Sequence, residues 1–349
     1  MIWLLSVAAA VASFVFTGLL RRYALSRSLL DTPNARSSHT VPTPRGGGVA
    51  IVIVFLASAL LLQHQGAVGS SVALAIVGAG AFIAALGFAD DHRHIPARWR
   101  LLGHFGAASW ALYSLGGLPP VPMFGAVIDL GWGGHALAIV LLVWLLNLYN
   151  FMDGIDGIAA VQAICACLGA VLCYAVVGMG GLFLELGVLE LLLACATFGF
   201  LCWNFPIAKI FMGDAGSGFL GLSIGMLMLQ AVGLAPRLLW AWLILLGVFV
   251  VDATYTLLRR LLRGEAVYQA HRSHAYQIAA RRAARHTPVT VSVGLVVLCW
   301  LLPWALLVSA EVIDGMLAIL FAYAPLLAVC IWLRAGTAEV NSQGVENER

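Results

Sequence analysis

The sequence predicts an all-α polytopic membrane protein, and three observations favour this fold class. Hydrophobic residues make up 62% of the 349 positions, charged residues make up 10%, and the mean hydropathy is +0.97. A soluble core could not bury so much apolar surface. Apolar runs close to the length that crosses about 30 Å of hydrocarbon also recur from one end of the chain to the other.

Eleven of these runs are predicted to be transmembrane helices. They cover residues 2–20, 46–62, 70–89, 100–117, 135–150, 158–178, 186–203, 216–233, 237–258, 289–309 and 313–333. The first run differs from a signal peptide, because no basic region precedes it and Arg21 and Arg22 follow it. We therefore expect one multi-span domain over 1–335 and a disordered cytoplasmic tail over 336–349.

Positive charges predict how these helices are oriented, because Lys and Arg concentrate in short loops on the cytoplasmic side. With a periplasmic N-terminus and a cytoplasmic C-terminus, every Lys and Arg except Arg237 lies on the cytoplasmic side. A helix count that was wrong by one would destroy this asymmetry. The charges thus support both the count and the orientation.

Acidic side chains gather on the same side of the predicted membrane. Asp90 and Asp91 end the third helix, Asp153 and Asp156 follow the fifth, and Asp214 precedes the eighth. Five carboxylates near headgroup depth would repel one another, so we expect a bound cation or a basic partner to compensate them. A polar helix end would explain one such Asp, but it explains five together less well.

Two asparagines and a glycine-rich turn add oxygen ligands and free amides to this cluster. Asn147 and Asn150 are three residues apart at the end of the fifth helix, so both amides are expected to project toward Asp153. In "FMGDAGSGFLG", Ser217 can cap the eighth helix, whose first amides attract phosphate. Oxygen ligands of this kind suit Mg²⁺, which Asp214 could hold against a phosphate group.

Two cytoplasmic loops carry residues that favour anions. In the last loop, Arg272 of "HRSH" can bind a phosphate in a bidentate manner, and His271 and His274 can donate or accept beside it. The first loop is rich in Pro and Gly and holds Arg36, His39 and Arg45. A positively charged membrane anchor in the last loop and a rigid connector in the first are the alternatives.

In this order along the chain, the motifs resemble those of the polyprenyl-phosphate N-acetylhexosamine-1-phosphate transferases, within glycosyl transferase family 4. That family starts O-antigen, enterobacterial common antigen and peptidoglycan lipid intermediates. The resemblance runs from about residue 31 to 276 and rests on five motifs: "DxPNxRxxHxxPxPRGGG", "DDxxxI" (90–95), "NxxNxxDGxDG" (147–157), "GDxGSxxLG" (213–221) and the histidine-containing loop before the last two helices.

The resemblance implies transfer of a sugar-1-phosphate from a UDP-sugar to undecaprenyl phosphate, with release of UMP. It implies Mg²⁺ as cofactor, replaceable by Mn²⁺, held by Asp214 with Asn150 as a second ligand. The implied catalytic residues are Asp90 and Asp91 near the reacting phosphates, Asp153 near the uridine, and Asp156. The implied substrate-binding residues are Arg36, His39, Arg45, Asn147, Asn150, Ser217, His271, Arg272 and His274.

The resemblance also implies where the protein works and with what. The expected location is a bacterial inner membrane, with the active site at the cytoplasmic helix ends and with lipid as the surroundings. No nucleic acid partner is expected, and a homodimer is a candidate assembly. Many relatives carry adjacent histidines where this chain reads "HRSH", which looks like the branch that handles deoxy-amino sugars. The sugar therefore stays open.

Two other classes are less consistent with the sequence. A secondary transporter would place its polar site near the membrane midplane between repeats, whereas only Asp252 is partly embedded in a predicted helix. A CDP-alcohol phosphotransferase would share the D-x-x-D-G of "DGIDG". The residues after it lack the Ala-Arg and the further aspartates of that family.

The topology can be tested with reporter fusions after residues 66, 125 and 235. All three positions are expected to report a periplasmic location, because the charge asymmetry puts these loops outside. A cytoplasmic signal at any two of them would contradict the predicted arrangement.

Overall fold

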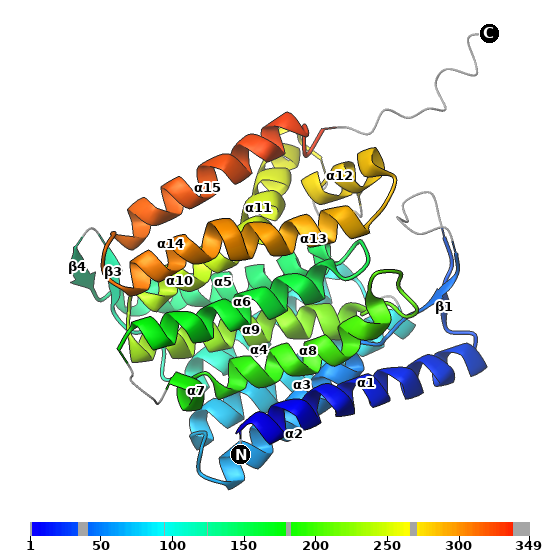
Figure 1. Ribbon diagram of the computed structural model, residues 1–349, viewed down its shortest axis with the longest axis horizontal. Coiled ribbons are helices and arrows are strands. Elements are labelled where there is room, and N and C mark those ends of the chain that lie inside the picture. Colours follow the sequence, from blue (N-terminus) through cyan, green and yellow to red (C-terminus); the bar gives the residue numbers. More distant parts are fainter. Residues whose placement is uncertain are drawn as a thin grey trace.

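The computed structural model describes residues 2–33, 41–93, 95–123, 125–178, 183–265 and 271–337, and most of them are helical (Figure 1). The first half of the chain forms α1 (Ile2–Ser26), α2 (Val49–His64), α3 (Ser70–His92), α4 (Ala97–Ser114), α5 (Gly131–Met152) and α6 (Ile158–Val176). The second half forms α7 (Phe183–Leu186), α8 (Val188–Asn204), α9 (Asp214–Leu234), α10 (Leu238–Leu245), α11 (Gly247–Leu262), α12 (Ala275–Ala283), α13 (Thr287–Val296), α14 (Leu302–Ser309) and α15 (Gly315–Trp332). A π-helical segment, Val297–Leu301, joins α13 to α14.

The helix lengths confirm a polytopic membrane protein. Within the described ranges, seven helical segments are long and apolar enough to cross a membrane, and the number reaches eight if α10 and α11 form one span. Two further helices, α2 and α8, are apolar but shorter. The count of eleven spans stays a prediction.

The expected ninth span, 237–258, differs from a straight helix. Its two parts, α10 and α11, meet at a bend of 71°. The break falls between Leu245 and Gly247, and glycine is a poor helix former because it has the most backbone freedom to lose. The second part, α11, therefore runs in a new direction, toward the segment that leads to α12.

Two short hairpins depart from the all-α expectation. Strand β1 (Leu30–Asp31) pairs antiparallel with β2 (Thr43–Pro44), and β3 (Val121–Met123) pairs with β4 (Ala126–Ile128). Proline within these segments disfavours helix because it lacks an N–H donor. Strand β2 is also hydrogen-bonded to the segment that precedes α9, because the N–H of Phe211 donates to the carbonyl of Pro44 at 2.8 Å.

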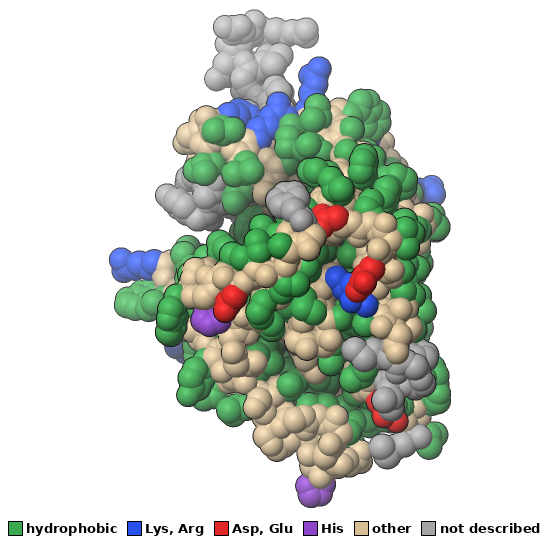
Figure 2. Space-filling model, turned by 90° about the vertical axis from the view of Figure 1, so that its left-hand side faces the viewer, with side chains coloured by type: hydrophobic (Ala, Val, Ile, Leu, Met, Phe, Trp, Pro, Cys, Tyr) green, Lys and Arg blue, Asp and Glu red, His purple; other side chains and the backbone are tan. Residues whose placement is uncertain are grey.

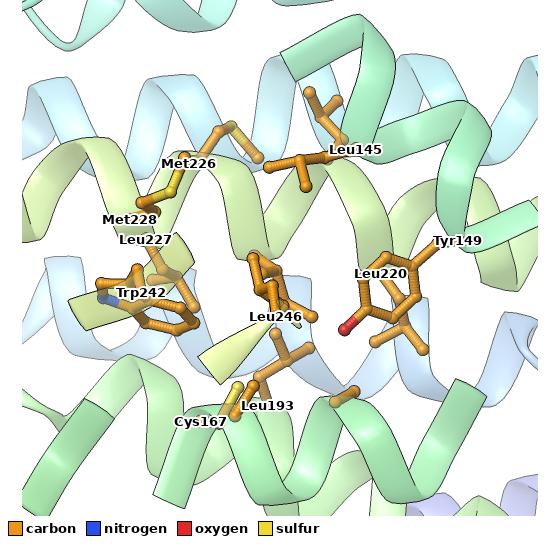
Figure 3. Packing of buried hydrophobic residues seen from close by; sticks show 14 of the residues in the cluster. Leu145, Tyr149, Cys167, Leu193, Leu220, Met226, Leu227, Met228, Trp242 and Leu246 are labelled. Atoms are coloured by element: carbon orange, nitrogen blue, oxygen red, sulfur yellow. The ribbon is translucent and has the colours of Figure 1, made fainter. Parts of the chain in front are cut away.

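Helix α9 lies in the middle of the bundle, where it packs mainly against α3 and α5 and also contacts α2, α4, α6 and α10 (Figure 1). Most of its length, 83%, is buried inside the protein. A methyl group on Gly221 would lie 2.4 Å from the carbonyl oxygen of Leu145, so a small residue is required for the close approach of α5 and α9. Figure 3 shows part of this core, in which Leu145 and Tyr149 of α5 and Leu220 and Met226 of α9 are buried. This dense core fixes the start of α9.

The loops gather at two opposite ends of the bundle. One end holds β1 and α12, and the other holds β3, β4 and α7 (Figure 1). At the second end, Nε1 of Trp240 donates to the carbonyl of Pro122 at 2.7 Å, and Arg237 pairs with Glu311. Figure 2 shows that on this end charged side chains are sparse. The predicted division of the loops between two sides of the membrane agrees with these two ends of the bundle. Which end faces the cytoplasm stays a prediction.

Candidate active site

The centre of the candidate site is Asp214, the first residue of α9. Gly213 precedes it with a φ of +78°, in the left-handed region that glycine tolerates. Asp91 of α3 caps this start: its Oδ1 accepts the N–H of Asp214 at 3.2 Å and its Oδ2 accepts the N–H of Ala215 at 3.4 Å. Helix α3 comes this close because Gly87, where a methyl group would lie 2.6 Å from the Ala215 nitrogen, has no side chain. The Asp91 carboxylate thus accepts hydrogen bonds from two backbone amides that have no partner within the helix itself.

Asn150, near the end of α5, joins the same network. Its Nδ2 donates to Oδ1 of Asp214 at 2.9 Å and to Oγ of Ser217 at 3.1 Å. The hydroxyl of Ser217 in turn donates to the carbonyl of Gly213 at 3.1 Å. The predicted pair of Asp214 and Asn150 therefore lies within direct contact, although these residues are 64 positions apart.

The expectation that both asparagines project toward Asp153 is wrong for Asn147. Its Nδ2 donates to the carbonyl of Val143 at 2.7 Å and lies 3.3 Å from Nδ1 of His104 on α4. Residues three apart on a helix point about 60° away from each other. That angle directs Asn150 to α9 and Asn147 to α4.

Arg100 of α4 links two of the predicted acids. It forms an ion pair with Asp90, and its Nη1 lies 3.5 Å from Oδ2 of Asp214. Asp90 also accepts the N–H of Ile95 at 2.7 Å. Arg100 is one of the predicted cytoplasmic charges, but it was not predicted as a site residue. The one sequence feature that could have indicated Arg100 as a site residue is its short distance, nine residues, from Asp91.

Arg45 enters the site from the turn after β2. Its Nη1 lies 3.8 Å from Oδ1 of Asp91, and its Nη2 lies 3.6 Å from Oδ2 of Asp31. The other candidates in this loop, Arg36 and His39, lie outside the described residues. Arg45 and Arg100 therefore flank the acids from two sides.

Two cavities meet at Asp214 and Asn150, which line both. The Asp156 cavity, of about 230 Å³, is mainly polar and includes Arg45, Asp153, Asp156, Phe211 and His286. The His104 cavity, of about 150 Å³, has Asp90, Arg100 and His104 on one side and Leu86, Leu101 and Leu146 on another. The site can thus present the Asp214 carboxylate to one polar and one largely apolar compartment.

Asp153 and Asp156 both line the Asp156 cavity. Burial raises the pKa of the Asp153 carboxyl well above its usual range, and the nearby carboxylates of Asp214, Asp91 and Asp156 raise it further. Asp156 has a basic neighbour, because Nδ1 of His286 lies 3.2 Å from its Oδ2. The sequence analysis missed His286, which is 130 positions away along the chain.

The three candidate residues of the "HRSH" motif, His271, Arg272 and His274, face different surroundings. His271 contacts Oγ of Ser273 through Nδ1 at 2.9 Å, and the buried His274 has its Nδ1 3.3 Å from Oδ1 of Asp252. Arg272 lines the Arg272 cavity, an open space of about 1100 Å³ shared with Arg281 and Arg285. The Arg272 cavity adjoins the Asp156 cavity, since both include Asp156, Phe211, Gln277 and His286. Of the three candidate residues in this motif, Arg272 is therefore the one whose position best fits the expected role, which is to bind a phosphate group.

The donor set around Asp214 limits what kind of metal could bind. Among the residues with described positions, no group of three or more His, Cys, Asp or Glu is arranged to hold a metal ion. Asp91 is occupied by the amides of α9 and Asp90 by Arg100 and Ile95. Asp214 keeps a side chain that is 33% exposed. This set fits an ion such as Mg²⁺, which commonly binds one or two carboxylates together with substrate phosphates and water.

Comparison with known proteins identifies the class. The model of glycosyl transferase family 4 matches residues 73–232. A decaprenyl-phosphate N-acetylglucosaminephosphotransferase of Mycolicibacterium smegmatis is 30% identical over 78% of this chain and 74% of its own length. A probable undecaprenyl-phosphate N-acetylglucosaminyl 1-phosphate transferase of Bacillus subtilis is 29% identical over 75% and 72%. A phospho-N-acetylmuramoyl-pentapeptide-transferase of Halalkalibacterium halodurans is 27% identical over 83% and 91%.

These matches, together with the helical membrane fold, show that the chain belongs to glycosyl transferase family 4. The resemblance found in the five motifs is thereby confirmed. The chain is an enzyme of the membrane, and the three relatives named above are all transferases.

The raised pKa of Asp153 predicts a pH-dependent effect on stability. Because the pKa is higher in the folded state, Asp153 favours folding fully only below its unfolded pKa of about 4, and this contribution is lost as the pH rises. In buffer free of divalent cations, Asp153→Asn should therefore raise the Tm at pH 7.5 and raise it less at pH 5. The exposed Asp129 provides the control Asp129→Asn. Equal changes in Tm for Asp153→Asn at both pH values would contradict the raised pKa of Asp153.

Proposed function

We propose that the protein transfers a sugar-1-phosphate from a UDP-sugar to undecaprenyl phosphate, releasing UMP and starting a lipid-linked surface glycan. The sugar is an N-acetylated amino or deoxyamino sugar. One observation carries the proposal: Asp214 stands between a polar and a largely apolar cavity, with an arginine on each side. The names of the relatives support the same class of reaction.

The two cavities differ in the way that the two substrates differ. The His104 cavity combines Arg100 with Leu86, Leu101 and Leu146, which suits a phosphate attached to an isoprenoid chain. The Asp156 cavity is mainly polar and carries the aromatic ring of Phe211, which suits a water-soluble nucleotide sugar. It continues into the open Arg272 cavity, whose lining is largely apolar but includes three arginines that suit phosphate groups. We therefore assign the acceptor to the first and the donor to the other two.

The reaction joins two anions, so charge compensation is the main requirement. A phosphate monoester has a second pKa near 6, and at pH 7 the acceptor is mostly dianionic and needs little help from a general base. An acceptor oxygen attacks the sugar-linked phosphorus, and the bond from that phosphorus to the bridging oxygen breaks, so UMP leaves with the bridging oxygen. Arg100 and Arg45 are placed to bind the phosphates on the two sides of this bond.

Asp214 is the residue that we assign to Mg²⁺, with Asn150 beside it and with Mn²⁺ as a substitute. When bound, the ion supplies Lewis-acid stabilisation of the developing charge. The amide nitrogen of Asn150 faces Asp214, so its oxygen would have to turn for direct ligation. Asp91 fixes the start of α9, and Asp90 orients Arg100. Neither of these two roles requires contact with the metal.

The test of the function is UMP release by purified protein in the presence of undecaprenyl phosphate and Mg²⁺. The proposal expects release with at least one UDP-N-acetylamino sugar and none when the lipid phosphate is omitted. Absence of release with UDP-linked N-acetylglucosamine and with its deoxy-amino counterparts would contradict it.

Asp214→Asn is expected to lower kcat about a thousandfold or more while the protein stays folded. Asn keeps the shape of Asp but removes the charge, and Lewis-acid stabilisation is worth several kcal/mol at roughly tenfold per 1.36 kcal/mol. Steady-state UMP release and a matched Tm would be measured, with Asp129→Asn as control. A loss within about tenfold at saturating Mg²⁺ would move the metal away from Asp214.

Arg272→Ala is expected to raise the KM for the UDP-sugar, because Arg272 lines the open cavity assigned to the donor. Arg285 lines the same cavity and is therefore no neutral comparison. Arg282 is the better control, since its guanidinium lies 5.3 Å from the ring centre of Trp332. Equal changes in Arg272→Ala and Arg282→Ala would favour the membrane-anchor interpretation of the loop.

A further inference from the structure

A buried carboxylate outside the candidate site holds the start of α12. Asp252 lies on α11 and is only 4% exposed. Its Oδ1 accepts the N–H of Ala275 at 2.8 Å, and its Oδ2 accepts the N–H of Tyr276 at 3.0 Å. Because α12 has only nine residues, these two bonds at its first turn define where the whole helix sits.

The remaining contacts of Asp252 also point to this segment. Nδ1 of His274 lies 3.3 Å from its Oδ1, and the hydroxyl of Thr256 donates to the same atom at 3.1 Å. From the other side, the N–H of Gly336 donates to the carbonyl of Ser273 at 2.8 Å. All of these contacts of the carboxylate hold the chain, and Asp252 lines none of the three cavities described above.

Helix α12 in turn holds the turn that follows α5. The hydroxyl of Tyr276 donates to the carbonyl of Phe151 at 2.9 Å. A methyl group on Gly154 would lie 2.1 Å from that hydroxyl oxygen, so the two segments are in close contact. Gln277, the next residue, lines both the Asp156 cavity and the Arg272 cavity. The turn over 151–154 carries Asp153 into the Asp156 cavity.

We propose that Asp252 is a positioning residue for the transfer reaction. By fixing the first turn of α12, it places Tyr276 against the 151–154 turn and Gln277 between the two cavities assigned to the donor. It therefore sets the shape of the donor side without touching a substrate. This inference rests on the proposed function.

The position of α12 predicts a selective kinetic effect. Residues of α12 line the donor cavities, whereas none of them lines the His104 cavity, which is built from α3, α4, α5 and α9. Helix α12 contacts one lining residue of the His104 cavity, Phe151, through its backbone carbonyl. Asp252→Asn keeps the size of the side chain but turns an amide donor toward a backbone N–H. The KM for the UDP-sugar should rise about tenfold or more, while the KM for undecaprenyl phosphate should stay within about twofold.

A double-mutant cycle tests whether the effect passes through Tyr276. Tyr276→Phe removes the hydroxyl that binds the carbonyl of Phe151 and also interacts with Gly154 and Gln277, and it should raise the donor KM in the same way. If both residues act in one path, the double variant should exceed Asp252→Asn by no more than about twofold. Asp314→Asn is the control, because Asp314 caps α15 through the N–H groups of Met316 and Leu317. It should leave both KM values within about twofold.

Hydrogen exchange of the wild-type and variant proteins gives a readout that does not depend on turnover. Asp252→Asn should speed exchange over both 275–283 and 151–157, and Asp314→Asn should change neither. Faster exchange confined to 275–283, equal rises in both KM values, or multiplying effects of Asp252→Asn and Tyr276→Phe would each overturn the inference. A wild-type protein without UMP release would refute the proposed function, and exchange alone would then decide whether Asp252 positions the turn.

Discussion

The capping of α9 by Asp91 is the interaction on which the candidate site depends. A helix that begins inside a bundle leaves its first amides without partners, and in a membrane such groups are costly. Asp91 reaches these amides from α3, with a side chain that is 4% exposed. The same contact fixes Asp214, because its own N–H is one of the two that are bound. Any shift of α3 against α9 would therefore move the residue assigned to the metal.

The rest of the site is built outward from this start. Asn150 binds the Asp214 side chain from α5, and Arg100 approaches it from α4 while paired with Asp90. Four helices thus converge on one carboxylate at one end of the bundle. That placement suits chemistry between a lipid that cannot leave the membrane and a nucleotide sugar that cannot enter it. Burial raises the pKa of Asp153 most, and repulsion from Asp214, Asp91 and Asp156 raises it further; a bound cation would relieve this repulsion.

Composition and motif order were sufficient to predict the membrane fold, the family and the gathering of five aspartates. They worked because helix ends on one side of a membrane must meet, whatever their distance along the chain. The direction of individual side chains was harder to predict. Asn147 and Asn150 share a helix end, but a rotation of about 60° sends them to different neighbours.

Partners that are distant in sequence escaped prediction altogether. Arg100 looked like one positive charge among many, and its pairing with Asp90 depends on how α3 and α4 pack. Asp252 was predicted only as a partly embedded acid, although it binds the start of α12, more than twenty positions further along the chain. The bend between α10 and α11 was missed because the apolar pattern continues through it.

An experimental structure of the protein with a UDP-sugar and Mn²⁺ would test the central claim most directly. The anomalous signal of manganese marks the metal without ambiguity. We predict that the ion lies in direct or water-bridged contact with Asp214 and with the donor diphosphate, on the side of Arg45. An ion and diphosphate bound out of reach of Asp214 would contradict the account.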